Sequence, residues 1–112
     1  MRSLLTTFII TLIIFNSVAK CANSGKDIFY NSKGKYGTCN TCHTNGGSAG
    51  RFDISSGEVS DDEGKKIPSL KGIGKRKERE HIERDVVRME NTFGFKLSDF
   101  EIEQLVDYVS TY

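Results

Sequence analysis

The sequence predicts an all-α domain of about three to four helices, and three observations support this fold class. A segment near the C-terminus begins with a helix-capping pattern and continues with an apolar face at helical spacing. A second, strongly charged segment carries an apolar stripe at the same spacing. No segment after residue 24 shows the alternation of apolar and polar side chains that is typical of a half-buried strand. The length of 112 residues fits a single domain.

The first 24 residues have the three parts of a secretory signal peptide. Met1 and Arg2 form a basic start, and residues 4–15 are a twelve-residue apolar run that only threonines interrupt. This run is shorter than the ~20 residues that a membrane-spanning helix needs. We therefore expect residues 1–24 to be a signal peptide and residues 25–112 to be a folded domain that is periplasmic or otherwise exported.

Two cleavage sites fit the pattern of small residues at signal-peptide junctions, one after Ala19 and one after Ser24. The second is favoured because it removes Cys21, and a free thiol in an exported protein is unusual. Lipid modification of Cys21 is a third alternative, although Lys20 stands where a small residue is expected. Membrane association is expected only if this segment is retained or lipidated. Removal of residues 1–24 takes away Arg2 and Lys20 and no acid, so the net charge changes from +1 to −1. That balance excludes a strongly basic nucleic-acid-binding protein.

The folded domain begins with a predicted helix over residues 25–31, whose apolar part is residues 28–30. Gly34 and Gly37 then interrupt the chain before residue 39. Residues 44–66 are rich in glycine, serine and aspartate and hold few apolar side chains, so they predict a long loop.

The second half of the domain predicts two further helices, preceded by a short apolar turn at residues 67–70. A charged helix is expected over residues 75–90, and a loop over residues 91–96. The last helix starts at the capping box formed by Ser98 and Glu101. Its apolar face follows the i, i+3, i+4, i+7 spacing and consists of Ile102, Leu105, Val106 and Val109.

The motif that decides the function is Cys39-Asn40-Thr41-Cys42-His43. Cys-x-x-Cys-His is the attachment signature of c-type haem. Two thiols at this spacing lie on the same side of one helical turn, so both can add to the vinyl groups of a single porphyrin. His43 then supplies an imidazole as axial ligand to the iron. We therefore predict one covalently attached haem c, with its iron bound by His43.

Three other uses of the motif are less favoured. A redox-active Cys-x-x-Cys is expected near a βαβ pattern, which this chain lacks. A structural zinc site usually has four Cys or His ligands, and outside the motif the chain offers only Cys21 and His81. A local disulfide between Cys39 and Cys42 is the remaining alternative if haem is never attached.

An exported, mostly helical chain of this size with one such motif resembles the class I cytochrome c family. Residues 25–29 are similar to the family's first-helix pattern and residues 105–109 to its last-helix pattern. The resemblance implies a small cytochrome c fold in which these two helices cross and the helices surround one haem. Pro68-Ser69-Leu70 is similar to the family's Pro-x-Leu turn. It implies that the Pro68 carbonyl accepts a hydrogen bond from the far nitrogen of His43, and that Leu70 packs on the ring.

The sixth iron ligand implied by the resemblance is Met89, the only methionine after residue 24. Residues 89–99 resemble the family's segment from the ligand methionine into the last helix. Glu90 replaces the usual proline, and one extra residue precedes Phe93. Core packing is the alternative role for Met89. His81 is a rival ligand, although its charged neighbours favour a solvated helix face.

These expectations favour a non-enzymatic electron carrier with protein redox partners, such as an oxidase, a reductase or a dehydrogenase. No small-molecule substrate and no nucleic acid are expected. Basic residues crowd the range 65–79 and acids crowd the last helix, which indicates either docking surfaces or ordinary solvated faces. A five-coordinate haem that binds a gas or peroxide is one alternative. A haem subunit of a larger oxidoreductase is another, since residues 35–39 are loosely similar to the small cytochrome subunit of thiosulfate-oxidising complexes.

Overall fold

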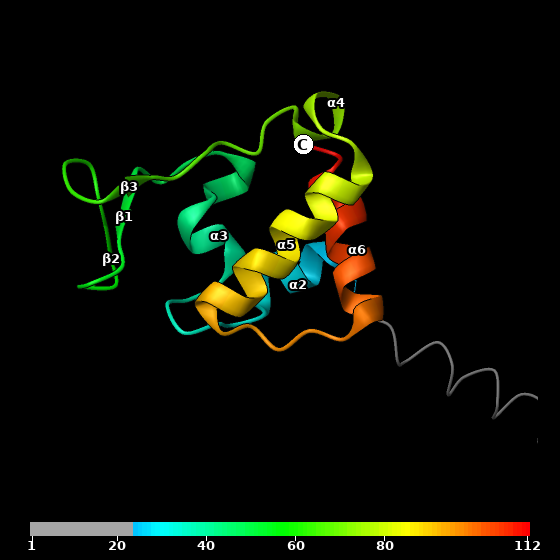
Figure 1. Cartoon of the computed structure of the whole chain (residues 1–112), viewed down its shortest axis with the longest axis horizontal. Coiled ribbons are helices and arrows are strands. Elements are labelled where there is room, and N and C mark those ends of the chain that lie inside the picture. The colour runs from blue at the N-terminus through cyan, green and yellow to red at the C-terminus, as the bar shows by residue number, and fades with distance from the viewer. Residues whose placement is uncertain (1–23) are drawn as a thin grey trace, which may run out of the picture.

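The computed structural model describes residues 24–112 (Figure 1). Apart from Ser24, the predicted signal peptide lies outside the described residues, so its cleavage and the export of the chain stay predictions. Residues 24–112 form five α-helices, one 3₁₀ turn and a three-stranded antiparallel sheet. The prediction of an all-α domain with three to four helices is therefore wrong, because the domain mixes helices with a small sheet. No helix in this range is long and apolar enough to cross a membrane.

The elements follow one another along the chain with short connections. In order they are α2 (Gly25–Asn31), α3 (Cys39–Cys42), the 3₁₀ turn η1 (Thr44–Gly46), β1 (Arg51–Asp53), β2 (Glu58–Ser60), β3 (Lys65–Lys66), α4 (Ile73–Arg76), α5 (Arg79–Phe93) and α6 (Asp99–Val109). Figure 1 shows the three strands projecting to one side of the helices.

The sheet occupies the segment for which a long loop was expected. Its strand order is β2-β1-β3, with Phe52 opposite Val59 and Arg51 opposite Lys66. Each strand has only two or three residues, and Phe52 is the one strand residue that is buried. Strands this short cannot display the alternation by which a strand is recognised in a sequence. The glycines between the strands are typical of turns, and for this reason a loop was predicted for the whole segment.

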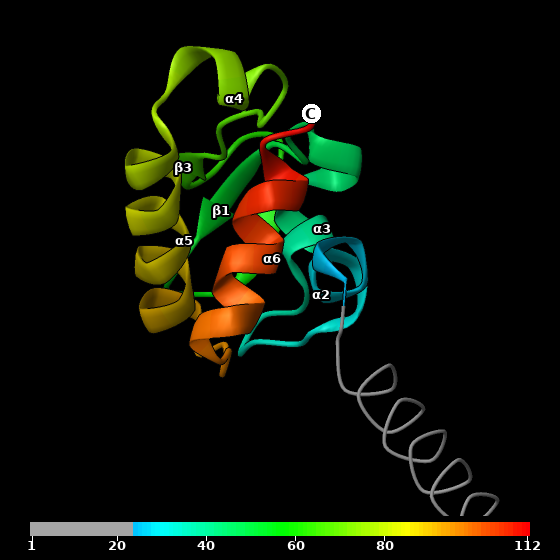
Figure 2. The same ribbon diagram turned by 90° about the vertical axis from the view of Figure 1, so that its right-hand side faces the viewer.

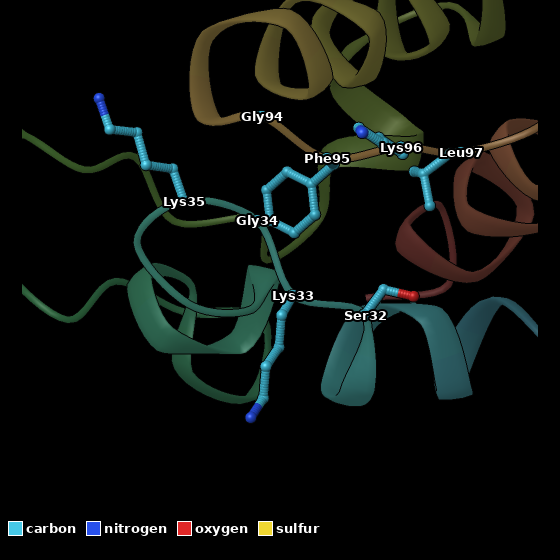
Figure 3. Close-up of a pocket in the computed structure, with 8 residues that line it drawn as sticks. All are labelled: Ser32, Lys33, Gly34, Lys35, Gly94, Phe95, Lys96 and Leu97. Carbon is cyan, nitrogen blue, oxygen red and sulfur yellow. The ribbon is translucent and has the colours of Figure 1, made fainter.

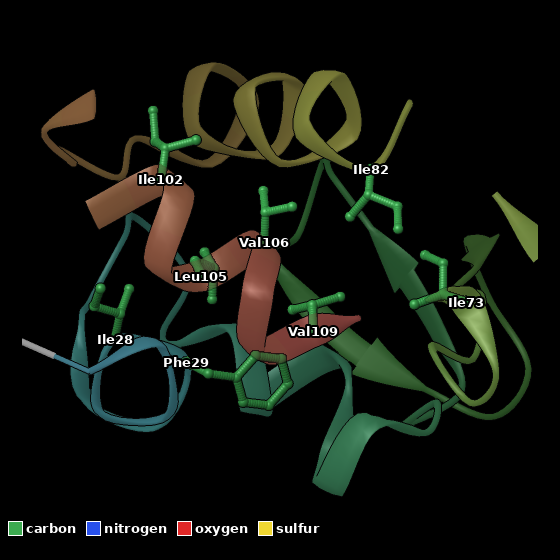
Figure 4. Close-up of a cluster of buried hydrophobic side chains, with 8 residues drawn as sticks. All are labelled: Ile28, Phe29, Ile73, Ile82, Ile102, Leu105, Val106 and Val109. Atoms are coloured by element: carbon green, nitrogen blue, oxygen red, sulfur yellow. The ribbon is translucent and has the colours of Figure 1, made fainter. Parts of the chain in front are cut away.

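The core forms where α2 crosses α6 (Figures 2 and 4). Ile28 and Phe29 of α2 are each 1% exposed and pack against the apolar face of α6. Gly25 is the point of closest approach, because a Cβ atom there would overlap the carbonyl oxygen of Gln104. The crossing implied by the family resemblance is present. The core also includes Ile73 of α4 and Ile82 of α5.

The ends of the helices are set by local capping groups. Ser24 caps α2, since its Oγ accepts a hydrogen bond of 3.2 Å from the amide of Asp27. The predicted capping box of the last helix is confirmed, with Ser98 Oγ 3.1 Å from the Glu101 amide and Glu101 Oε1 3.1 Å from the Ser98 amide. Instead of one helix over residues 75–90, the chain forms α4 and α5. The second begins after Glu78 and continues to Phe93, which shortens the predicted loop before α6.

Candidate haem site

The Cys-x-x-Cys-His motif forms α3, a single helical turn with its own cap. Thr38 precedes the turn, and its amide donates a hydrogen bond of 3.0 Å to Thr41 Oγ1. The amide of His43 donates to the carbonyl oxygen of Cys39 at 2.9 Å, which closes the turn. The threonine inside the motif therefore stabilises the turn that carries both thiols.

Cys39 and Cys42 are both thiols rather than a disulfide. Burial raises the pKa of Cys39 to about 11, and burial also raises the pKa of Cys42. Both groups are therefore protonated at neutral pH. Reactive dithiols have a lowered cysteine pKa, so these raised values argue against a redox-active dithiol.

His43 is fixed by a hydrogen bond from its ring. Its Nδ1 atom lies 3.0 Å from the carbonyl oxygen of Pro68, which is the contact that the family resemblance implies. When Nδ1 donates to a carbonyl, Nε2 carries the lone pair and is the nitrogen available to a metal. Burial lowers the pKa of His43, although the carbonyl groups of Pro68 and Gly47 act in the opposite direction. A neutral imidazole is the form that ligates iron.

The segment that carries Pro68 is itself tied to the turn after the motif. The amide of Leu70 donates to the carbonyl oxygen of Gly46 at 2.8 Å. Leu70 is half-buried and packs against the main core, whereas Pro68 is exposed. The structure thus brings together four of the expected site residues around His43: Cys39, Cys42, Pro68 and Leu70.

Met89 lies on α5, within the helix rather than in a loop after it. It is on the same face as Ile82, Val86 and Phe93, because these residues follow the i, i+4, i+7, i+11 spacing. Exposure increases along this stripe, from 2% at Ile82 to 40% at Met89. Met89 is not part of the core cluster, and the alternative role in core packing receives no support. The rival His81 is exposed on the same helix.

The residues present fit a covalently attached haem. Two thiols stand on one turn, and the adjoining imidazole has Nδ1 bonded and Nε2 available. Within the described part of the chain, no group of three or more His, Cys, Asp or Glu side chains could hold a metal ion. The zinc alternative therefore has no ligand set there.

Several polar residues around the motif were not foreseen from the sequence. Asn45 donates its amide to Asn40 Oδ1 at 2.8 Å and accepts bonds from Tyr30 and Lys71. The Asn45-Gly46 pair is a turn signal that could have drawn attention to this position. The partners could not have been found, because Tyr30 and Lys71 lie 15 and 26 positions away.

A second unforeseen feature is a cluster of three aromatic rings. Phe52 of β1 lies with its ring centroid 5.2 Å from Tyr36 and 5.4 Å from Phe93. Tyr36 and Phe93 are themselves 6.0 Å apart. Edge-on ring pairs at these distances are favourable. They attach the sheet to the C-terminal end of α5 and to the segment before α3.

A pocket of roughly 550 Å³ is open to solvent and lies away from the motif. It forms between residues 32–35 and residues 94–97 (Figure 3). Lys33 and Lys35 extend from it in different directions, and the ring of Phe95 lies between the two segments. The lysines do not converge on one point, so the pocket is not a built anion site.

The basic segment of residues 65–79 is partly neutralised inside the chain. Arg79 pairs with Asp107 of α6, and Lys77 lies 2.8 Å from Asp85. Lys71 and Arg76 donate to the backbone carbonyl groups of Asn45 and Ser69, respectively. Only part of the segment is therefore available as a positive surface.

The chain was compared with protein-family models, curated proteins and solved structures, and none of them matches it.

Proposed function

We propose that this chain is an exported mono-haem c-type cytochrome that carries single electrons between protein partners. It would hold one haem c through Cys39 and Cys42, with iron bound by His43 and Met89. Bound haem supplies an iron centre that alternates between the ferrous and ferric states. With both axial positions taken, the chain would have no open site for a substrate and would not be an enzyme.

The observation that supports this proposal most strongly is the 3.0 Å hydrogen bond between His43 Nδ1 and Pro68 O. Such a bond fixes the tautomer and orientation of a metal-binding imidazole and makes it a stronger ligand. It involves the histidine that directly follows two unpaired thiols on one turn.

Each residue of the proposed site has a defined task. Cys39 and Cys42 would fix the position of the porphyrin, because two attachment points on one turn prevent its rotation. His43 would set the electron density at the iron, and Pro68 would tune it through the hydrogen bond. Leu70 would pack on the ring, as the family resemblance implies, from its half-buried position against the core.

The first test is the intact mass of the chain secreted by a host that can attach haem to cysteine. The expected result is the mass of the processed polypeptide plus one haem, and an unmodified mass would overturn the proposal. Replacement of Cys39 or Cys42 by serine is expected to remove one of the two attachments. The Thr41→Ser variant keeps both thiols and the hydroxyl that caps α3, and it serves as the control.

The role of Met89 is tested by absorption spectra of the oxidised and reduced protein. The wild type is expected to be low-spin, with the charge-transfer band of an iron–thioether bond. Met89→Ala is expected to lose this band and to shift toward high spin. Val86→Ala, which shortens a neighbouring side chain of the same stripe, should keep the band. An unchanged spectrum in Met89→Ala would exclude Met89 as the ligand.

A five-coordinate haem that binds a gas or peroxide is the second candidate function. Two observations favour it: Met89 is 40% exposed, and it lies inside α5 rather than in a loop. This function predicts high-spin iron in the wild type and rapid binding of carbon monoxide to the reduced form. A low-spin wild type that binds carbon monoxide slowly would exclude it.

Partner binding is tested by the rate of electron exchange with a candidate oxidase, reductase or dehydrogenase. Charge-steered docking predicts a strong change in rate between low and high ionic strength. Because four of the seven bases in residues 65–79 are engaged within the chain, Lys65, Lys66 and Lys75 are the ones to replace with glutamine. An electron-exchange rate that is the same at low and high ionic strength would exclude charge-steered docking. Stable co-purification with a larger protein would instead favour the subunit of an oxidoreductase.

A further inference from the structure

Asn45 stands two residues after His43 in a backbone conformation that is rare for a residue with a side chain. Its φ angle is 51° and its ψ angle is 36°, and it is the one non-glycine residue with positive φ in the range 24–112. Asparagine tolerates this left-handed conformation better than most residues. The chain reverses there, directly after the imidazole that is proposed to bind iron.

Three different segments hold Asn45 in this conformation. Its amide donates to Asn40 Oδ1 at 2.8 Å, which ties it to α3. Its side-chain oxygen accepts a 3.1 Å bond from the Tyr30 hydroxyl of α2. Its carbonyl oxygen accepts a 2.8 Å bond from Lys71 Nζ, which follows the Pro-x-Leu segment. One residue therefore links the motif to the two parts of the chain that surround it.

The next residue continues the connection to the partner of His43. The amide of Gly46 donates to the carbonyl oxygen of His43 at 2.9 Å, and the Gly46 carbonyl accepts from the Leu70 amide at 2.8 Å. The Tyr112 ring lies on Gly46, where a Cβ atom would overlap it. The turn thus fixes the distance between His43 and the segment that carries the Pro68 carbonyl.

We infer that Asn45 is a positioning residue for His43, and that Tyr30 acts with it. The inference rests on the proposed function, because it assigns to the pair the alignment of the proposed iron ligand with Pro68 O. Asn45 holds the turn, and the turn keeps the His43–Pro68 hydrogen bond short. That bond strengthens the imidazole as a ligand and so favours ferric iron. Loss of the Asn45–Tyr30 contact therefore raises the midpoint potential.

The test compares Asn45→Gly, Tyr30→Phe and the double variant in the complete chain made with its haem. Asn45→Gly permits the same left-handed backbone and removes the side-chain contact with Tyr30. Tyr30→Phe removes the same contact from the other side. Asn45→Asp keeps an acceptor for Tyr30 and is the rescue variant. Tyr36→Phe is the matched control, because it removes the same hydroxyl from a ring that packs on Phe52 and Phe93, outside the Asn45 turn.

Two readouts are used, hydrogen exchange of the Asn45 and Gly46 amides and the midpoint potential of the haem-bearing fraction. Asn45→Gly and Tyr30→Phe should each speed this exchange and raise the potential, with no larger effect in the double variant. Tyr36→Phe should resemble the wild type in both readouts, and Asn45→Asp should keep the slow exchange without raising the potential. Unchanged exchange and potential in the two test variants, or an equal shift in Tyr36→Phe, would overturn the inference. If intact mass shows no haem, the proposed function fails, and amide exchange alone still decides whether Asn45 anchors the turn.

Discussion

The ring of His43 and the carbonyl group of Pro68 are joined by a 3.0 Å hydrogen bond, although 25 positions separate them in the chain. The segment between these two residues begins and ends close to His43. Near its start the amide of Ala49 donates to the carbonyl oxygen of Cys42, and near its end Ile67 donates to Gly50, both at 2.9 Å. These hydrogen bonds join the two ends of the segment that contains the sheet. The geometry around His43 therefore does not depend on the strands farthest from it.

Pro68→Gly should weaken the His43 hydrogen bond without removing the carbonyl group. Glycine gives the unfolded chain more freedom, so we expect a loss of about 1 kcal/mol in the free energy of unfolding. In the haem-bearing protein the midpoint potential should rise, because the imidazole becomes a weaker ligand. Denaturant titration and redox titration measure the two effects. Ser69→Ala, at the neighbouring exposed position, should leave the potential unchanged.

Gly25→Ala should disrupt the crossing of α2 and α6. An added Cβ would overlap the carbonyl oxygen of Gln104 and approach the Cβ of Tyr108 within 2.6 Å. Overpacking of this kind costs about 1–3 kcal/mol of unfolding free energy. Denaturant titration of Gly25→Ala beside Lys26→Ala, an exposed position in the same helix, checks this. Equal stabilities would show that the helices do not meet at Gly25.

Asp53 should titrate below its usual pKa of 3.8. The Ser55 hydroxyl lowers its pKa by donating a 2.6 Å hydrogen bond to the carboxylate, and the Ser55 amide adds a second bond at 2.9 Å. Because the folded-state pKa is lowered, this contact stabilises the fold above pH 3.8. The contribution disappears as pH falls through the folded-state value.

Carboxyl resonances followed by nuclear magnetic resonance during acid titration measure this shift. Ser55→Ala should raise the pKa of Asp53 toward 3.8, and Ser55→Thr, which keeps the hydroxyl, should not. A pKa of Asp53 that is the same in wild type and Ser55→Ala would contradict the prediction.

The ion pair between Arg79 and Asp107 should contribute little to stability, although it joins α5 to α6. Both side chains are more than half exposed, so a double-mutant cycle with alanine should give about 0.5 kcal/mol at low salt and less at high salt. Leu105→Ala on the same helix is the contrast. Leu105 is 3% exposed, and its truncation should cost roughly 2–5 kcal/mol.

Two helices were located well from the sequence. α2 was predicted with its observed bounds, and α6 was placed by the Ser98–Glu101 capping box. The charged helix was predicted to begin at residue 75, whereas α5 begins after Glu78. No proline or glycine marks this start in the sequence. The end of α5 at Gly94 is marked by a glycine, yet the prediction ended the helix at residue 90 and placed a loop over residues 91–96.

The sheet was missed for a different reason. Its stability comes from Phe52 packing on Tyr36 and Phe93, which lie 16 and 41 positions away in the chain, and no local pattern reveals such contacts. The same limit applies to the site. The motif identifies Cys39, Cys42 and His43 by their spacing, but the surroundings of Asn45 depend on contacts between distant segments.

The hydroxyl of Ser24 at the beginning of α2 bears on where export processing would leave the chain. Proteolysis after Ala19 would preserve that residue, whereas proteolysis after Ser24 would delete it and put an ammonium group against the positive pole of the helix dipole. The loss of such a hydroxyl typically weakens a helix start by about 1 kcal/mol, and the new charge adds an unfavourable interaction. If the chain is processed as the sequence predicts, the cleavage position would therefore affect how firmly the α2–α6 crossing holds at its outer end.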